Sequence, residues 1–204
     1  MRRRPYAATP TTVRPGLIVI GCSLGGLQAL GPILSAFPPD FDVPIAVAQH
    51  RHHDSLGTLA TVLQRSSLLE VRDAEDGEPI RGGVVRLAPA DYHLLVDRQT
   101  FHLSTEKAVQ YSRPSIDVLF ESAADSWRAE TIGVVLTGAN RDGSDGAVAI
   151  RKQRGLIVVQ DPATAEADSM PRGAIEAAGA DAVLPPAEIG PWLVRACARE
   201  RAHA

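Results

Sequence analysis

The sequence predicts an α/β domain in which a mostly parallel sheet is covered by helices on both faces. Short apolar runs rich in Val, Ile and Leu recur along the chain, with helix-like segments between them. Continuous apolar runs are typical of strands that are buried on both faces. The 204 residues, 45% of them apolar, are enough for one compact domain with a substantial core.

Five runs are predicted strands and six segments are predicted helices. The strands lie at residues 17–20, 44–48, 132–136, 156–159 and 182–184. The helices lie at residues 26–36, 56–64, 115–128, 144–154, 171–178 and 189–200. This alternation of strand and helix indicates a layered α/β domain.

Residues 70–103 show a different pattern, in which apolar and polar residues alternate. Turn signals interrupt the alternation at Asp76-Gly77, Gly82-Gly83, Pro89-Ala90 and Asp97-Arg98. Alternation broken by such turns is typical of hairpins. We therefore expect antiparallel hairpins that are added to the sheet or lie at its edge.

The polar, proline-punctuated residues 1–16 predict a disordered N-terminal tail, followed by one domain at 17–200 and a short tail at 201–204. The basic start lacks the apolar core of a signal peptide. No apolar run approaches the roughly 20 residues that span a bilayer. These features predict a soluble, cytoplasmic protein without membrane insertion.

Charge and cysteine content narrow the function classes further. A formal net charge of −3 and a sequence pI near 6.1 show no excess of basic residues. Nucleic acid is therefore not a predicted partner. Cys22 and Cys197 are far apart in the sequence, which predicts two free thiols in a reducing compartment. The sequence predicts no cofactor.

The segment from Leu17 to Gly26, with the sequence LIVIGCSLGG, ends an apolar run in a serine framed by glycines. Glycines at such a strand-to-helix turn remove Cβ atoms that would clash, and they leave the hydroxyl of Ser23 exposed as a nucleophile. N–H groups at the start of the next helix can stabilise a negative oxygen there. The alternative is a glycine-rich turn that binds phosphate or only closes a loop. Cys22 is expected to point into the core.

Two other predicted strands end in residues that can assist a serine nucleophile. The strand at 44–48 runs into His50, and the strand at 132–136 leads to Asp142. Reactive groups gather beyond the carboxyl ends of parallel strands. Ser23, His50 and Asp142 therefore form a candidate catalytic triad of nucleophile, general base and orienting carboxylate, which would cleave an ester or amide through an acyl-enzyme.

Each partner of the serine also has an alternative role. His50 could be a structural histidine at a strand end, or could bind a metal together with His52 and His53, although no further ligand group has recognisable spacing. Asp142 could cap the helix that begins near Ser144. Asp145 and Asp161 are rival orienting carboxylates.

Six sequence blocks, in order, resemble the catalytic domain of the chemotaxis protein-glutamate methylesterase (CheB) family. The resemblance covers nearly the whole chain from Leu17 to Leu184. The blocks are IGCSLGG at 20–26, QH at 49–50, APADYH at 88–93, RPSIDVLF at 113–120, LTGANRDG at 136–143 and MPR at 170–172.

The resemblance implies a three-layer α/β/α fold, with Ser23 as nucleophile, His50 as base and Asp142 as the orienting carboxylate. It also implies hydrolysis of glutamyl methyl esters on chemoreceptors or a related signalling protein, and many members deamidate receptor glutamines. Leu24, Gly25, Ala139, Asn140 and Met170 would form the substrate and oxyanion region.

The chain departs from the family pattern at several positions. Leu24 stands where the family usually has threonine or serine, and Ala139 and Asn140 replace methionine and glycine. Losing one oxyanion donor can cost about 3 kcal/mol of transition-state stabilisation. The tail at 1–16 is too short for the family's receiver domain, so we expect either no phosphorylation control or control by a separate protein partner.

Two other functions compete with a receptor methylesterase. One is a general serine esterase of the α/β-hydrolase kind, but that fold needs a histidine after the acid, and only His203 in the C-terminal tail is available. The other is a catalytically weakened family member that serves as a docking or regulatory module, which Leu24, Ala139 and Asn140 suggest.

Overall fold

The computed structural model describes residues 14–51 and 58–198 of the chain. Its centre is a seven-stranded sheet in which every neighbouring pair of strands is parallel, in the order β3-β4-β2-β1-β7-β8-β9. The strands are β1 (Leu17–Cys22), β2 (Ile45–Gln49), β3 (Glu70–Asp73), β4 (Val84–Leu87), β7 (Thr131–Val135), β8 (Leu156–Gln160) and β9 (Ala182–Leu184).

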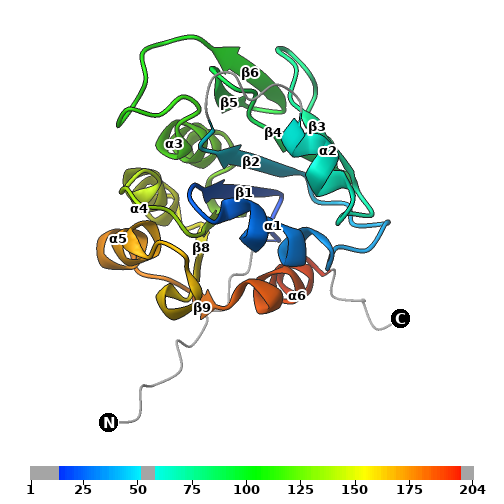
Figure 1. Cartoon of the computed structure of the whole chain (residues 1–204). Helices are drawn as coiled ribbons and strands as arrows, with labels where there is room; N and C mark the ends of the chain where they lie inside the picture. Colours follow the sequence, from blue (N-terminus) through cyan, green and yellow to red (C-terminus); the bar gives the residue numbers. More distant parts are fainter. Residues whose placement is uncertain (1–13, 52–57, 199–204) are drawn as a thin grey trace.

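Helices cover both faces of this sheet, so the three-layer α/β/α architecture is confirmed (Figure 1). One layer contains α3 (Ile116–Trp127), α4 (Ser144–Lys152) and α5 (Ser169–Ala178). The other contains α1 (Gly26–Leu34), α2 (Thr58–Gln64) and α6 (Pro186–Cys197). Two short 3-10 helices, η1 (Arg128–Glu130) and η2 (Pro162–Thr164), lie in connections.

Alternate residues of each central strand face the two helical layers. In β1, Ile18 and Ile20 pack with α1 and α6, whereas Leu17 and Val19 pack with α3 and α4. All six residues of β1 are buried. The continuous apolar run at its start is therefore explained by burial on both faces of the sheet.

The expectation of antiparallel hairpins throughout residues 70–103 is wrong for the first half of that segment. β3 and β4 pair in parallel and extend the main sheet, because the turns at Gly77 and Gly83 belong to a crossover connection and not to a tight hairpin. The second half does form a hairpin. β5 (His93–Asp97) and β6 (Thr100–Ser104) pair antiparallel around Arg98, which has a φ of 54°.

Residues 1–13 of the predicted tail at 1–16, and all of the predicted tail at 201–204, lie outside the described residues. Arg14 is described, and it donates to Asp42 at 2.6 Å and to the carbonyl of Cys197 at 3.3 Å. Cys22 and Cys197 are both free thiols, as expected. Within the described residues, every helix is too short or too polar to cross a membrane.

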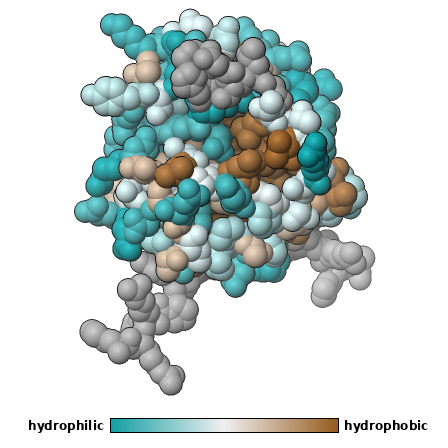
Figure 2. Space-filling view, in the orientation of Figure 1, coloured by the Kyte–Doolittle hydropathy of each residue, from teal (hydrophilic) through white to brown (hydrophobic). Residues whose placement is uncertain are grey.

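Apolar side chains gather on the face shown in Figure 2, over α2 and toward the start of α1. The exposed large apolar residues of these two elements and of the turn before α1 are Leu24, Leu27 and Val62. Leu24 directly follows Ser23, so part of this apolar surface adjoins the predicted nucleophile.

Candidate active site

The carboxyl ends of β1, β2 and β7 are aligned by the strand register. Cys22 pairs with Gln49, and Gly21 pairs with Val135. The pairing continues past the strands, because the N–H of Ser23 donates to the carbonyl of Thr137 at 2.9 Å and that of His50 to the carbonyl of Cys22 at 3.0 Å. Ser23 and His50 therefore lie side by side, on adjacent strands and just beyond the sheet.

The turn that carries Ser23 needs its glycines. Gly25 precedes α1 with a φ of 78°, in the left-handed region that favours glycine. A Cβ at Gly21 would lie 2.2 Å from Cγ2 of Ile116, so the end of β1 packs directly against the start of α3. Ser23 itself is half-buried, and its hydroxyl makes no hydrogen bond to any residue that the structure describes.

Cys22, the neighbour of Ser23, points into the core as predicted. Its side chain is fully buried, and its thiol donates to Oε1 of Gln49 at 3.1 Å. Burial raises the pKa of this thiol far above its ordinary value. Because the thiolate is the nucleophilic form of cysteine, Cys22 is unsuited to replace Ser23 as nucleophile.

His50 and Asp142 are in direct contact. Nε2 of His50 lies 2.7 Å from Oδ2 of Asp142. A carboxylate can only accept, so Nε2 is the nitrogen that donates, and the neutral ring keeps an unprotonated Nδ1. The imidazole is 13% exposed and the carboxylate is fully buried, so this contact is shielded from water.

Asp142 is held at the amino end of α3. Its Oδ1 accepts from the hydroxyl of Ser115 at 3.0 Å and from the N–H of Asp117 at 2.9 Å, and its Oδ2 accepts from the N–H of Ile116 at 2.8 Å. Burial alone would raise the pKa of Asp142, but the hydrogen bonds from His50 and from these N–H groups outweigh it and lower the pKa. Asp142 is thus kept as a carboxylate facing His50.

Asp117 makes a similar set of hydrogen bonds at the amino end of α4. It lies in the first turn of α3, and its Oδ1 accepts from the N–H groups of Gly143 and Gly146, both at 2.8 Å, at the amino end of α4. Asp117 of α3 therefore lies at the amino end of α4, and Asp142, just before α4, lies at the amino end of α3. Burial raises the pKa of Asp117, and the nearby Asp142 adds to that effect.

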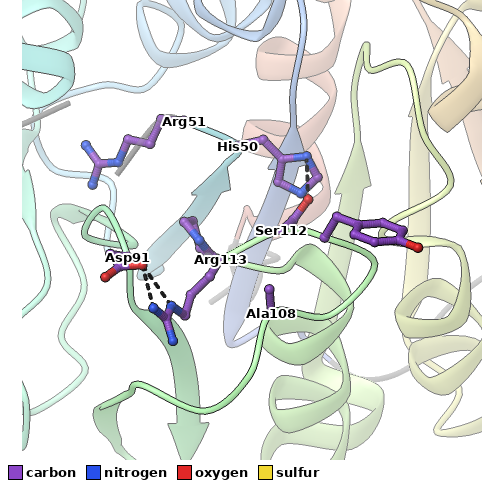
Figure 3. Close-up of a pocket in the computed structure, with 8 residues that line it drawn as sticks. His50, Arg51, Asp91, Ala108, Ser112 and Arg113 are labelled. Atoms are coloured by element: carbon purple, nitrogen blue, oxygen red, sulfur yellow. Dashed lines mark hydrogen bonds and ion pairs between the residues drawn. The ribbon is translucent and has the colours of Figure 1, made fainter. Parts of the chain in front are cut away.

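A pocket of about 560 Å³ opens beside His50 (Figure 3). In this view Arg113 reaches Asp91, to which it donates twice, at 3.0 and 2.6 Å. Ser112 faces His50, with its hydroxyl 3.5 Å from Nδ1. The remaining lining residues are Arg51, Ala108, Tyr111 and Pro114.

The residues expected in the substrate and oxyanion region fall into two groups. Leu24, Gly25, Ala139 and Asn140 lie at the surface of the turns after β1 and β7, whereas Met170 is fully buried. Met170 packs beneath Gly138, where a Cβ would lie 1.9 Å from its sulfur. The N–H groups of Leu24 and Ala139 have no acceptor among the described residues, so both are free to bind a ligand oxygen.

The alternatives for the orienting carboxylate lie elsewhere in the structure. Asp145 is exposed in α4, and Asp161 caps η2 by accepting from the N–H of Ala163 at 3.0 Å. Gly143, and not Asp142, is the cap residue of α4. His52 and His53, the companions of His50 in the metal alternative, lie outside the described residues.

Ser115 and Ser112 are site residues that motif reasoning did not single out. Ser115 is the cap residue of α3, where its hydroxyl accepts from the N–H of Val118 at 3.4 Å and donates to Asp142. A serine before a predicted helix is a recognisable cap signal, so the helix start was predictable. Its contact with Asp142 depends on the tertiary packing of α3 against α4.

Comparison with known proteins agrees with the fold. Residues 18–193 match the family model described as CheB methylesterase. The crystal structure of the Thermotoga maritima CheB methylesterase catalytic domain superimposes with a TM-score of 0.86, at 35% identity, covering 90% of this chain and 99% of that chain.

Two sequence relatives extend the comparison. A Leptospira interrogans protein is 45% identical over 179 residues, which cover 87% of this chain and 93% of that protein. The protein-glutamate methylesterase/protein-glutamine glutaminase 2 of Caulobacter vibrioides is 41% identical over 198 residues, but this chain spans only 57% of its length. The chain belongs to the CheB methylesterase family.

Proposed function

We propose that the protein hydrolyses methyl esters of glutamate side chains on a chemoreceptor or related signalling protein in the cytoplasm. The observation that carries the proposal is the 2.7 Å contact between His50 and Asp142, on the strand end next to Ser23. Neighbouring strands are about 4.8 Å apart, so the backbones of Ser23 and His50 lie next to each other at the strand ends. Family membership supports the same reaction.

Ser23 acts as the nucleophile and His50 as the general base. Nδ1 of His50 takes the hydroxyl proton while Oγ attacks the ester carbonyl carbon, and Asp142 stabilises the imidazolium that forms. The tetrahedral intermediate then collapses, and the same proton passes from Nδ1 to the departing methoxide, which leaves as methanol. Water attacks the acyl-enzyme by the reverse proton path and releases the free glutamate.

We assign stabilisation of the negative oxygen of the intermediate to the backbone N–H groups of Leu24 and Ala139. Neither N–H has an acceptor among the described residues. Leu24 directly follows Ser23, and Ala139 follows Gly138, where a Cβ would lie 2.9 Å from Cβ of Ser23. Oxyanion donors of this kind are backbone groups in many hydrolases. The apolar side chain of Leu24 is therefore compatible with catalysis, although it supplies no hydroxyl donor.

The same groups support hydrolysis of a glutamine side-chain amide. Only the leaving group differs, because Nδ1 would protonate the departing amide nitrogen, which leaves as ammonia, instead of the departing methoxide. The name of the Caulobacter vibrioides relative includes protein-glutamine glutaminase activity. We propose deamidation as a second reaction of this site.

The test combines a fluorophosphonate probe with methanol release from a methylated receptor fragment. Wild-type protein should be labelled and should release methanol, whereas Ser23→Ala should do neither, because the nucleophilic oxygen is missing. Ser35→Ala is the matched control, since Ser35 is an exposed serine whose hydroxyl donates only to the carbonyl of Pro32. It should behave as wild type.

The possible outcomes distinguish the proposed function from three alternatives. Folded wild-type protein that is not labelled would favour a docking module over an enzyme. Labelling together with hydrolysis of small acyl esters alone would retain the serine mechanism and reject the receptor substrate. Equal labelling of Ser23→Ala would reject Ser23 as nucleophile.

A further inference from the structure

The pocket beside His50 is lined by both charged and apolar side chains. Arg51, Asp91 and Arg113 supply charged groups, whereas Ala108, Tyr111 and Pro114 supply apolar surface. All three apolar residues belong to one segment, residues 108–114, which connects the β5–β6 hairpin to α3. A ligand in this pocket therefore meets apolar surface from that segment, beside the polar side chains of Ser112 and Arg113.

The tip of this segment is a strained turn. Val109 and Ser112 exchange two backbone hydrogen bonds, at 3.1 and 2.8 Å, around Gln110 and Tyr111. These two central residues have φ values of 47° and 64°. Such a turn usually contains Gly, Asn or Asp, and other residues cost about 1–2 kcal/mol each in the left-handed region. Strain of this kind persists where the surrounding structure enforces it, and it clusters at functional sites.

Contacts on both sides hold the turn in place. Nε2 of Gln110 donates to Oδ2 of Asp117 at 2.9 Å, and Asp117 also binds the N–H of Gly143. The hydroxyl of Ser112 faces Nδ1 of His50. The turn is thus tied to the same helix start that holds Asp142, so its tip is fixed relative to the proposed general base.

Tyr111 stands at this tip with its whole side chain in solvent, at 104% relative exposure. A fully exposed tyrosine gains nothing from burial in the free protein. Tyrosine is a preferred contact residue in binding surfaces, because its ring offers a large area and loses little side-chain entropy. The strained and anchored turn therefore presents an unused aromatic ring at the mouth of the pocket.

We propose that Tyr111 is a specificity-determining residue that packs against an aliphatic side chain of the polypeptide substrate, close in space to the esterified glutamate. This inference rests on the proposed methylesterase function. A small ester can meet the ring only where it lines the mouth of the pocket, whereas a polypeptide continues beyond the mouth and can cover the exposed ring. The contact requires the ring and not its hydroxyl, since the adjoining wall of Ala108 and Pro114 is apolar.

The experiment compares Tyr111→Ala, Tyr111→Phe and wild type on two substrates. For methanol release from a methylated receptor fragment, Tyr111→Ala should raise KM roughly tenfold, with kcat changed less than about twofold, and Tyr111→Phe should match wild type. For a small p-nitrophenyl ester and for the rate of fluorophosphonate labelling, Tyr111→Ala should lose much less than on the receptor fragment, because these probes cover little of the exposed ring. Leu68→Ala is the matched control, because Leu68 is another exposed apolar residue, at 69%, outside the pocket lining.

Several results would overturn the inference. An unchanged KM of Tyr111→Ala for the receptor fragment would show that the ring makes no substrate contact, while leaving the methylesterase function intact. Equal losses on the small ester would show that Tyr111 only supports the site. Wild-type protein that releases no methanol would reject the proposed function itself, and with it this contact.

Discussion

Asp142 is the residue on which the proposed chemistry depends most, because it is both fully buried and directly bonded to His50. A buried carboxylate is stable only when its hydrogen-bonding capacity is filled. Four donors fill it here, and two of them are backbone groups at the start of α3. The orientation of the imidazole is therefore set by the packing of a helix and not by a flexible loop.

This environment predicts how Asp142 contributes to stability as the pH changes. Its pKa is lower in the folded state than the ordinary value of about 3.9, so its stabilising effect is complete above that value and is lost as the pH falls through the folded-state pKa. Asp142→Asn should therefore lower the free energy of unfolding more at pH 7 than at pH 3. Urea unfolding at both pH values measures the difference.

Asp161→Asn is the control for that measurement, because the variant keeps an oxygen that can accept from Ala163 at an exposed position. Its free energy of unfolding should stay close to that of wild type at both pH values. An effect of Asp142→Asn that is equal at pH 7 and pH 3 would contradict the assignment of a lowered pKa to Asp142.

At the scale of secondary-structure elements, the interface between α3 and α4 carries the site. Gly146 of α4 lies against α3 so closely that a Cβ there would be 2.4 Å from Cβ of Phe120 and 3.2 Å from backbone atoms of Asp117. Its N–H also donates to Asp117. The N–H of Gly146 can reach Asp117 only at this short separation of the two helices.

Gly146→Ala should therefore destabilise the protein by about 1–3 kcal/mol, because the backbone must shift to admit the methyl group. Activity should fall as well, since the shift moves Asp142. Gly31→Ala in α1 is the matched control: the added Cβ would meet only Ser66 at 3.7 Å, and alanine is the better helix former. Thermal unfolding should show a lower Tm for the first variant and an unchanged or higher Tm for the second.

The sequence predicted the strands that are buried on both faces, because their apolar runs are continuous. It misassigned β3 and β4, where alternating residues and glycine turns suggested hairpins, since strand partners depend on chain connections that a local pattern does not encode. It placed Ser23, His50 and Asp142 near one sheet edge from topology alone. It could not show that α3 supplies the donors to Asp142, which results from helix packing.

At the scale of the whole molecule, the two thiols report on global unfolding. Cys22 is buried beneath the sheet end and Cys197 lies in α6, with only 3% of its surface exposed. Burial raises the pKa of both thiols, that of Cys197 to about 12. Thiol reagents react with the thiolate, so both conditions for reaction are absent in the folded state.

Ellman's reagent at pH 8 should therefore react with native protein only slowly, at a rate set by unfolding. In guanidinium chloride both thiols should react at the rate of free cysteine. Esterase activity should survive treatment of the native protein with the reagent. Fast reaction of one thiol per chain in the native state would contradict the buried positions of Cys22 and Cys197.

The connection between β7 and α4 has fixed ends and an exposed middle. Gly138 donates to the carbonyl of Ala167 at 2.9 Å on one side, and Asp142 is fully buried on the other, whereas Ala139 and Arg141 are exposed between them. A randomised library at these two positions would thus vary the surface near Ser23, while the positions of Gly138 and Asp142 stay unchanged. Directed evolution toward new ester substrates can begin at this short stretch without first stabilising the scaffold.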